Sequence, residues 1–240
     1  MTIMADAKSN PEDAVSLQPR GKVRGRYEYL LVALFLLVVV YPFIAGSELG
    51  RMTLTFSLAI IMIAGTLAVS RRRFALITSL VLALPAIASR EFYNFQHWEW
   101  ALQMTLVTAT GFMAFNAIVI LREVLRHRVV TQHTIYGAIC VYVLIGMAFA
   151  LGYALLEHVH PGSFNLVQDT AAPDRDAQLI SFSFVTLTTV GYGDITPATP
   201  GARALCNFEA LLGQLYLAVL IARLVGSYMG GNRGPDDAGK

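Results

Sequence analysis

The chain has 240 residues, of which 55% are hydrophobic and only 14% are charged, and its mean hydropathy is +0.56. This composition is too apolar and too sparsely charged for a soluble domain, so the sequence predicts a membrane protein. The formal net charge of +2 arises from short basic clusters between apolar runs, which gives no sign of a nucleic-acid partner.

Residues 1–28 form a polar N-terminal segment that contains Pro11 and Pro19. The sequence predicts a disordered cytoplasmic tail here, which ends in the basic residues Arg20, Lys22, Arg24 and Arg26. The apolar run from Tyr29 to Gly46 follows without a convincing small-residue cleavage pattern. A membrane anchor is therefore expected in preference to a removed signal peptide.

Six apolar runs are each close to the ~20 residues that ~30 Å of hydrocarbon requires. They cover residues 29–46, 52–70, 74–89, 100–121, 135–156 and 204–229. The third run is short and contains Pro85, so it is expected to be kinked or partly displaced toward the membrane interface.

Basic residues are concentrated in alternate connections between these runs. Beyond the N-terminal cluster they are Arg71, Arg72, Arg73, Arg122, Arg126 and Arg128. The positive-inside rule then predicts a multi-pass protein of the cell membrane with both termini in the cytoplasm. The outer loop between the third and fourth runs is expected to hold an interfacial belt of aromatic residues, namely Phe92, Tyr93, Phe95, Trp98 and Trp100.

The cysteines and histidines do not indicate a reactive or metal-binding centre. Cys140 and Cys206 fall inside apolar runs and are expected to be buried small hydrophobic side chains. The five histidines show no metal-ligand spacing with carboxylates, and no nucleophile and base pair stands out. The sequence therefore predicts neither an enzyme nor a bound cofactor.

The connection between the fifth and sixth runs, residues 157–203, is far longer than a tight turn needs. Residues 176–189 can form a short helix, with Asp176 expected to cap its first turn. About a dozen residues cannot cross the bilayer. The segment is therefore expected to enter the membrane as a helix and to return as irregular backbone.

The irregular part has the sequence TTVGYGD, from Thr188 to Asp194. Gly191 and Gly193 can adopt φ values that are closed to other residues, so that neighbouring carbonyls point to one side. Such a row of oxygens can coordinate a dehydrating cation, and the dipole of the preceding helix adds negative potential. One loop cannot surround an ion, whereas four copies can, which favours a homotetramer.

This motif, between a short helix and a further apolar run, resembles the signature filter of the potassium-channel superfamily. The resemblance implies that K+ is bound by the backbone carbonyls of Thr189, Val190, Gly191 and Tyr192 and by the Thr189 hydroxyl. Gly193 would permit the outer turn. The implied fold is an all-α membrane protein of six transmembrane helices, with a re-entrant pore helix and filter loop between helices five and six.

The resemblance implies supporting residues as well: Thr188, Asp194 and Ser181. Asp194 lies just outside the filter, where a carboxylate can brace the loop or simply attract cations. Many relatives have tryptophans at the positions of Ser181 and Phe182, so this chain departs from the usual support. Gly213 is a candidate for the hinge glycine of the inner helix, and the alternative is a small residue that lets two helices approach closely.

The outer connection is rich in acids, with Arg175 as its one strong base before Asp194. The acids are Glu157, Asp169, Asp174, Asp176 and Asp194. Four copies of this connection are expected to concentrate cations near the pore mouth, although a solvated loop would explain some of these residues.

The first four runs have the layout of a voltage-sensor bundle without its charges. Residues 101–121 contain no Lys, Arg or His, so the membrane field has no charge to move there. The predicted domains are a bundle (29–121), a cytoplasmic linker (122–134), a pore domain (135–229) and a short cytoplasmic tail (230–240).

The leading prediction is a prokaryotic-type, homotetrameric, potassium-selective channel that conducts passively with weak or no voltage dependence. Its expected partners are further copies of itself and membrane lipid. The alternative is a nonconducting ligand-binding or regulatory membrane subunit that retains the pore fold.

Overall fold

The computed structural model describes residues 26–44, 58, 60–67, 73–96, 98–126, 131–167 and 172–231. This part of the chain is mostly helical, which confirms the predicted all-α class. The helices are α1 (Arg26–Ile44), α3 (Arg73–Gln96), α4 (Glu99–Arg126), α5 (Gln132–Val159), α6 (Ala172–Leu187) and α7 (Pro200–Gly231). Residues 60–67 are also helical, and two short strands, β1 (Phe164–Asn165) and β2 (Thr196–Pro197), pair antiparallel.

Within the described residues, four helices are long and apolar enough to cross a membrane, as expected of a multi-pass membrane protein. These stretches are Arg73–Tyr93, Glu99–Arg126, Gln132–Val159 and Pro200–Gly226. Helix α1 adds a shorter apolar stretch, Tyr27–Phe43. The second predicted run is described only at residue 58 and residues 60–67, so the count of six spans stays a prediction.

The predicted length of the third run is wrong. Helix α3 has 24 residues, contains Pro85 and continues to Gln96, beyond the predicted end at Ser89. Hydropathy falls at Arg90, but helical hydrogen bonding does not depend on hydropathy and continues for nearly two more turns. Most of the aromatic residues assigned to the outer loop therefore belong to helix ends. The Phe92 ring centroid lies 5.3 Å from that of Trp98 and 5.5 Å from that of Trp100.

Helices extend into the predicted linker and into both predicted tails, which are therefore shorter than expected. Of residues 122–134, helix α4 takes residues up to Arg126 and helix α5 begins at Gln132. Thr131 and Thr134 form a capping box at the start of α5, which fixes where this helix begins. Residues 26–28 and 230–231 are helical as well, whereas residues 1–25 and 232–240 of the predicted tails lie outside the described residues.

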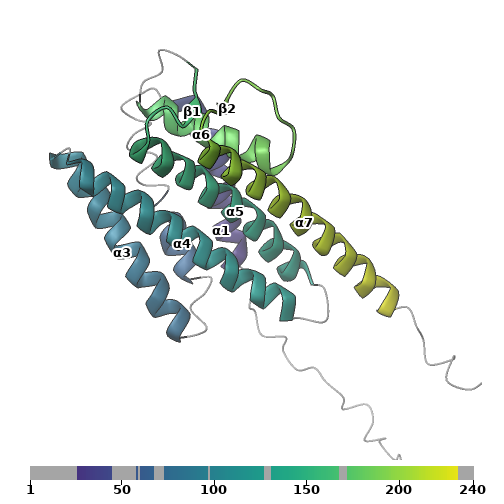
Figure 1. Ribbon diagram of the computed structural model, residues 1–240. Coiled ribbons are helices and arrows are strands. Elements are labelled where there is room, and N and C mark those ends of the chain that lie inside the picture. The colour runs from purple at the N-terminus through teal and green to yellow at the C-terminus, as the bar shows by residue number, and fades with distance from the viewer. Residues whose placement is uncertain are drawn as a thin grey trace, which may run out of the picture.

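Helices α4 and α5 pack along each other, and α1 lies against α5 and α6 of the same chain (Figure 1). One stripe of α1 makes this contact, because Leu30, Leu34, Leu37 and Tyr41 recur at helical spacing and are all buried. Helix α1 thus packs on α5 and α6 of the same chain through this stripe.

Hydroxyl and amide groups join the helices of the bundle. Asn116 Nδ2 lies within hydrogen-bonding distance of Ser79 Oγ (3.4 Å), and Ser89 Oγ lies 2.9 Å from Thr105 Oγ1. These contacts are the interhelical hydrogen bonds expected of polar residues in membrane helices.

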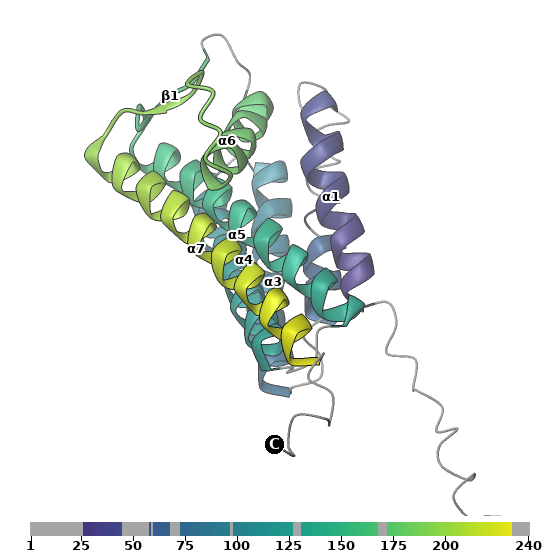
Figure 2. The ribbon, with the colours of Figure 1, turned by 90° about the vertical axis from the view of Figure 1, so that its right-hand side faces the viewer.

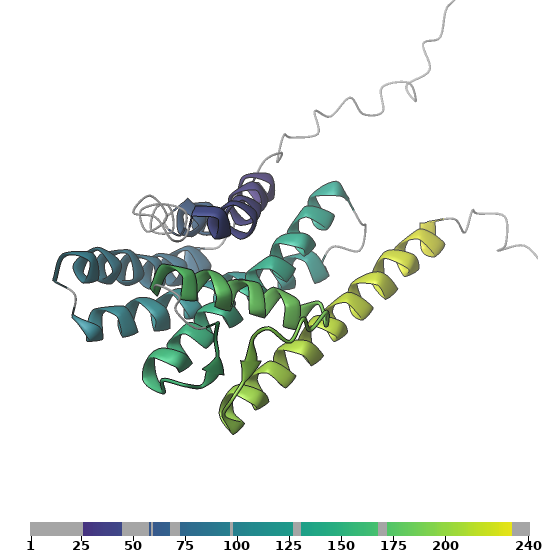
Figure 3. The same ribbon diagram turned by 90° about the horizontal axis from the view of Figure 1, so that it is seen from above.

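Helix α6 lies between α1 and α7, as two perpendicular views show (Figures 2 and 3). It is much shorter than α5 and α7, and it lies beside only one end of these two helices (Figure 2). The start of α1 and the end of α7 lie at the opposite end from α6 (Figure 2). This arrangement puts both helix termini on one side, while their cytoplasmic location stays a prediction.

Candidate functional site

Helix α6 begins at Ala172, four residues before the predicted start, so the assignment of Asp176 as its cap is wrong. Proline suits the first turn of a helix because its missing N–H has no partner to lose, and Pro173 allows the earlier start. Asp176 lies one turn into the helix and is half-buried. Burial raises the pKa of its carboxyl, and the charge of Arg90 opposes part of that rise.

The chain leaves α6 through a tight set of backbone hydrogen bonds. Thr189 N donates to Thr186 O (2.9 Å), and Val190 N donates to Val185 O (2.9 Å). The carbonyl of Leu187, the last helical residue, accepts a hydrogen bond from Tyr142 Oη of α5 (3.3 Å). The inner end of the loop is therefore fixed to both α6 and α5.

Three alternate residues of the loop have positive φ: 59° at Thr189, 60° at Gly191 and 80° at Gly193. The two glycines adopt the conformation that their lack of a Cβ permits. Thr189 was not predicted to do so, because a β-branched residue at positive φ is rare and costs about 1–3 kcal/mol. Among the described residues it is the one non-glycine residue in this conformation.

This alternation of positive and negative φ turns successive peptide groups the same way, so that carbonyls gather on one side. Within the described part of the chain, the carbonyls of Thr189, Val190, Gly191 and Tyr192 accept no hydrogen bond. The side chains of Val190 and Tyr192 are 55% and 74% exposed. The single chain thus presents both a row of unpaired oxygens and an uncovered apolar surface beside it.

The predicted supporting residues differ in their contacts. Thr188 Oγ1 donates to Phe184 O (2.6 Å), which secures the last turn of α6. Ser181 and Asp194 are both exposed, and no hydrogen bond joins them in the described part of the chain. Ser181 lines a cavity of about 290 Å³ between α1, α6 and the loop, which Val190 and Tyr192 line as well. Their supporting roles stay predictions.

Gly213 packs directly against the end of α6. A Cβ at this position would collide with the Leu187 carbonyl oxygen, and α7 continues as one helix through it. This geometry favours the interpretation of Gly213 as a small residue that permits a close helix approach. Its role as a gating hinge stays a prediction.

A buried carboxyl group behind the loop was missed by the sequence patterns. Glu209 of α7 has no exposed surface, and it accepts hydrogen bonds from Ser183 Oγ of α6 and Tyr153 Oη of α5. A sequence signal was present, because an ionisable residue inside an apolar run is by default a functional candidate. Cys140 and Cys206 are both buried free thiols, as predicted.

The outer connection is more ordered than its acidic composition suggests. The Glu157 carboxylate accepts the backbone N–H groups of Gly162 (2.9 Å) and Phe164 (3.0 Å), next to the β1–β2 pairing. Glu157 therefore organises this segment, whereas Asp194 is exposed. Asp169 and the side chain of Asp174 lie outside the described part, so focusing of cations at the mouth stays a prediction.

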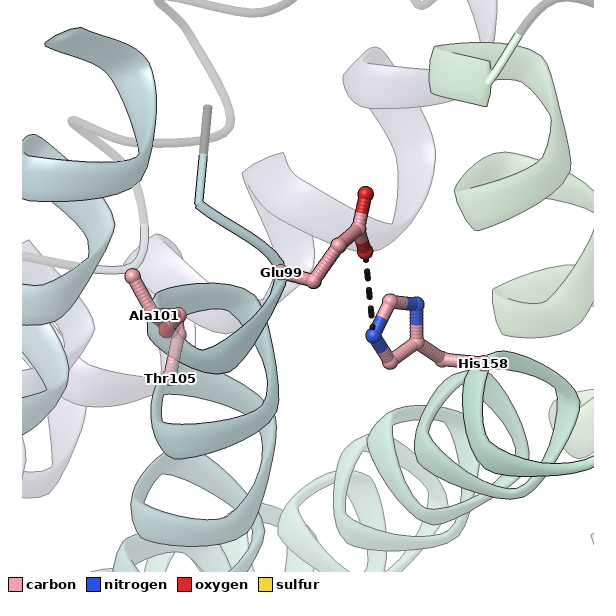
Figure 4. Close-up of polar contacts among 4 residues, drawn as sticks. All are labelled: Glu99, Ala101, Thr105 and His158. Carbon is pink, nitrogen blue, oxygen red and sulfur yellow. Dashed lines mark hydrogen bonds and ion pairs between the residues drawn. The ribbon is translucent and has the colours of Figure 1, made fainter. Parts of the chain in front are cut away.

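A contact between Glu99 and His158 links the start of α4 to the end of α5. Figure 4 shows the Glu99 carboxylate directed toward the His158 ring, with Oε2 3.4 Å from Nε2. The contact joins the bundle to the helix that carries Tyr142 and Tyr153.

Comparison with known proteins identifies the segment that contains this site. Residues 176–229 match a family model described as an ion channel. The chain is 38% identical over 84 residues to two pore potassium channel c of Oryza sativa subsp. japonica, covering 35% of this chain and 16% of that one. It is 38% identical over 82 residues to the inward rectifier potassium channel Kirbac3.1 of Paramagnetospirillum magnetotacticum, covering 32% and 24%.

A third relative is Protein LctB of Bacillus caldotenax, which is 34% identical over 87 residues, covering 35% of this chain and 64% of that protein. The matched region therefore spans between 16% and 64% of the length of these three relatives. The matches confirm the resemblance of the pore segment to the potassium-channel superfamily. They relate this segment of the chain to ion channels.

Proposed function

We propose that this chain is the subunit of a homotetrameric, potassium-selective channel that conducts passively. The observation that carries the proposal is the alternation of φ at Thr189, Gly191 and Gly193, next to carbonyls that accept no hydrogen bond in the described part of the chain. Backbone carbonyls at membrane depth are tolerated where they line a water-filled path or bind ions.

In the proposed filter, the carbonyls of Thr189, Val190, Gly191 and Tyr192 replace the water around K+, and the Thr189 hydroxyl forms the innermost ring. The names of two relatives support K+ as the ion. Gln214 Nε2 of α7 lies 3.4 Å from Thr189 Oγ1, so the inner helix has a contact with this hydroxyl.

The exposed surface of α7 and the loop supports assembly from several copies. Of the apolar stretch of α7, 11% is buried within the chain, against 44% for α4 and for α5. Lipid alone would explain exposed aliphatic side chains on a helix. A largely exposed Tyr192 beside a row of unpaired carbonyls is better explained by neighbouring copies around a central axis.

Weak voltage dependence and cytoplasmic termini complete the proposal. Each elementary charge that crosses the membrane field contributes ~2.3 kcal/mol for a voltage step of 100 mV. Residues 101–121 of α4 carry no basic side chain, so this segment has no such charge to move. Arg122 and Arg126, in the last turns of α4, fit the cytoplasmic side by the positive-inside rule.

The test is flux of K+ and Na+ into liposomes that contain the purified protein. Wild type is expected to pass K+ and to exclude Na+, whereas Gly191→Ala is expected to abolish flux because alanine disfavours positive φ. Gly162→Ala is the matched control, because Gly162 also has positive φ (83°) and open space around it but lies outside the filter. Intact K+ flux in Gly191→Ala, or equal passage of Na+ in wild type, would overturn the proposal.

A further inference from the structure

The Glu209 carboxyl group lies inside the apolar stretch of α7 with none of its surface exposed. Burying such a group is unfavourable unless its oxygens are hydrogen-bonded. Both oxygens have hydroxyl partners: Ser183 Oγ lies 2.5 Å from Oε1, and Tyr153 Oη donates to Oε2. The two donors come from α6 and α5, so this one side chain joins three helices.

The partners of Glu209 are themselves buried and fixed. Ser183 and Tyr153 have no exposed surface, and Ser183 Oγ also lies 2.7 Å from Gly146 O of α5. Within the described part of the chain, no Lys, Arg or His forms an ion pair with Glu209. The carboxyl group is therefore held by hydroxyl groups, which are directional, rather than by a mobile basic side chain.

These contacts set the register between α7 and α6. Glu209 contacts Ser183, and one helical turn further along both helices Gly213 packs against the Leu187 carbonyl. The following residue, Gln214, contacts the Thr189 hydroxyl. A continuous series of contacts thus runs from the middle of α6 to Thr189 in the loop.

A shift of α7 along α6 would affect the two kinds of contact differently. Apolar contacts can re-form in a neighbouring register, whereas a displaced Glu209 would lose its hydrogen bonds to Ser183 and Tyr153 and leave a buried carboxyl group without partners. The polar cluster therefore selects one register among those that apolar packing permits.

We infer that Glu209 is a positioning residue for the filter: through Ser183 and Tyr153 it fixes the inner helix against the pore helix and so holds the Thr189 end of the loop. This inference rests on the proposed channel function. It adds a structural requirement for conduction that lies outside the TTVGYGD motif.

The test compares substitutions at Glu209 by single-channel recording in planar bilayers with K+ and Na+. Glu209→Gln keeps the side-chain length, an acceptor for Tyr153 and a donor toward Ser183, so wild-type open times and selectivity are expected. Glu209→Met keeps a similar volume without the polar ends. It is expected to shorten the mean open time roughly tenfold and to lower the K+/Na+ permeability ratio, because the buried hydroxyl groups lose their partner.

Asn116→Leu is the matched control, since Asn116 is also fully buried and hydrogen-bonded but lies in the bundle. It is expected to leave open time and selectivity unchanged. Wild-type behaviour of Glu209→Met would overturn the inference, and so would equal loss in Glu209→Gln and Glu209→Met.

A second variant keeps the inference testable if Glu209→Met does not assemble. Tyr153→Phe removes one hydrogen bond and no carbon atoms, and a several-fold shorter open time is expected. Unchanged open times in Tyr153→Phe would then overturn the inference. Absence of K+ current in wild type would overturn the proposed function itself, so the two failures are distinguishable.

Discussion

The pore half of the chain (α5 to α7) and the bundle (the helices before α5) are held together in different ways. In the pore half, hydroxyl groups of α5 and α7 reach specific backbone or carboxyl oxygens, such as Tyr142 to Leu187 O and Tyr216 to Ala138 O (2.6 Å). In the bundle, small hydroxyl side chains pair with one another, such as Thr66 Oγ1 with Ser79 Oγ at 3.2 Å. A long polar side chain can therefore fix the register of two helices whose backbones lie further apart than a short side chain could bridge.

The comparison teaches where accuracy is needed. In the proposed filter, the carbonyl oxygens of the loop would have to lie at fixed positions to coordinate an ion, and α6 and α7 both contact this loop. The bundle has only to pack against α5, for which apolar surface and a few weak hydrogen bonds are sufficient. Substitutions are therefore expected to have larger effects in the pore half than in the bundle.

A large effect is expected at Gly213. Gly213→Ala places a methyl group against the Leu187 carbonyl, and such overpacking costs about 1–3 kcal/mol. Gly226→Ala is the control on the same helix, because nothing lies within 4 Å of a Cβ there. Thermal unfolding of the detergent-solubilised assembly measures both variants. Altered gating of Gly213→Ala with unchanged stability would instead favour the hinge role.

Two serines of α6 separate buried from exposed positions within the pore half. Ser183→Ala removes the hydroxyl partner of Glu209 Oε1 and of the Gly146 carbonyl, and a loss of about 1–3 kcal/mol in unfolding free energy is expected. Ser181→Ala, at an exposed position on the same helix, is expected to stay within about 0.5 kcal/mol of wild type. Equal losses in the two variants would contradict the difference drawn between these positions.

A smaller effect is expected in the bundle. Thr105→Val removes the hydroxyl that pairs with Ser89 but keeps the branched shape of the side chain. The expected loss is about 0.6 kcal/mol, the typical strength of such an interhelical bond. Unfolding in detergent is again the measurement, and a loss as large as that of Ser183→Ala would remove the distinction between the two halves.

The smallest effect is expected where the halves meet at Glu99 and His158. Because the Glu99 side chain is 74% exposed, Glu99→Gln is expected to change stability by less than about 1 kcal/mol. Added salt is expected to reduce this difference further, because it screens exposed charges. An effect of Glu99→Gln that persists in high salt would show that the contact is less accessible to solvent than the structure indicates.

Local chemistry made part of the site predictable. Glycine is the residue that tolerates positive φ, so the conformation of Gly191 and Gly193 follows from their identity. The positive φ of Thr189 does not follow from its identity. It depends on contacts of Thr189 and its neighbours with α5, α6 and α7. The partners of Glu209 were equally inaccessible, since Tyr153 and Ser183 are distant from it in sequence and on other helices.

The fold divides in the same way. Hydropathy located the apolar cores of the described helices, but it placed the end of α3 too early and the start of α6 too late. At both boundaries the helix continues through a polar turn, because backbone hydrogen bonds form in polar and apolar turns alike. The pairing of β1 with β2 was not predicted, because two-residue strands carry no periodic pattern.

Helix α6 ends part of the way down α5 and α7, so the lower part of α7 has no pore helix beside it (Figure 2). In the proposed fourfold assembly, an ion below the loop would have no pore helix beside it and would keep its hydration shell. Dehydration would then be confined to residues 189–193, and most of the transmembrane voltage would fall across this short distance. The rate of ion conduction would therefore depend on a small fraction of the membrane thickness, and the remaining depth would be a water-filled path.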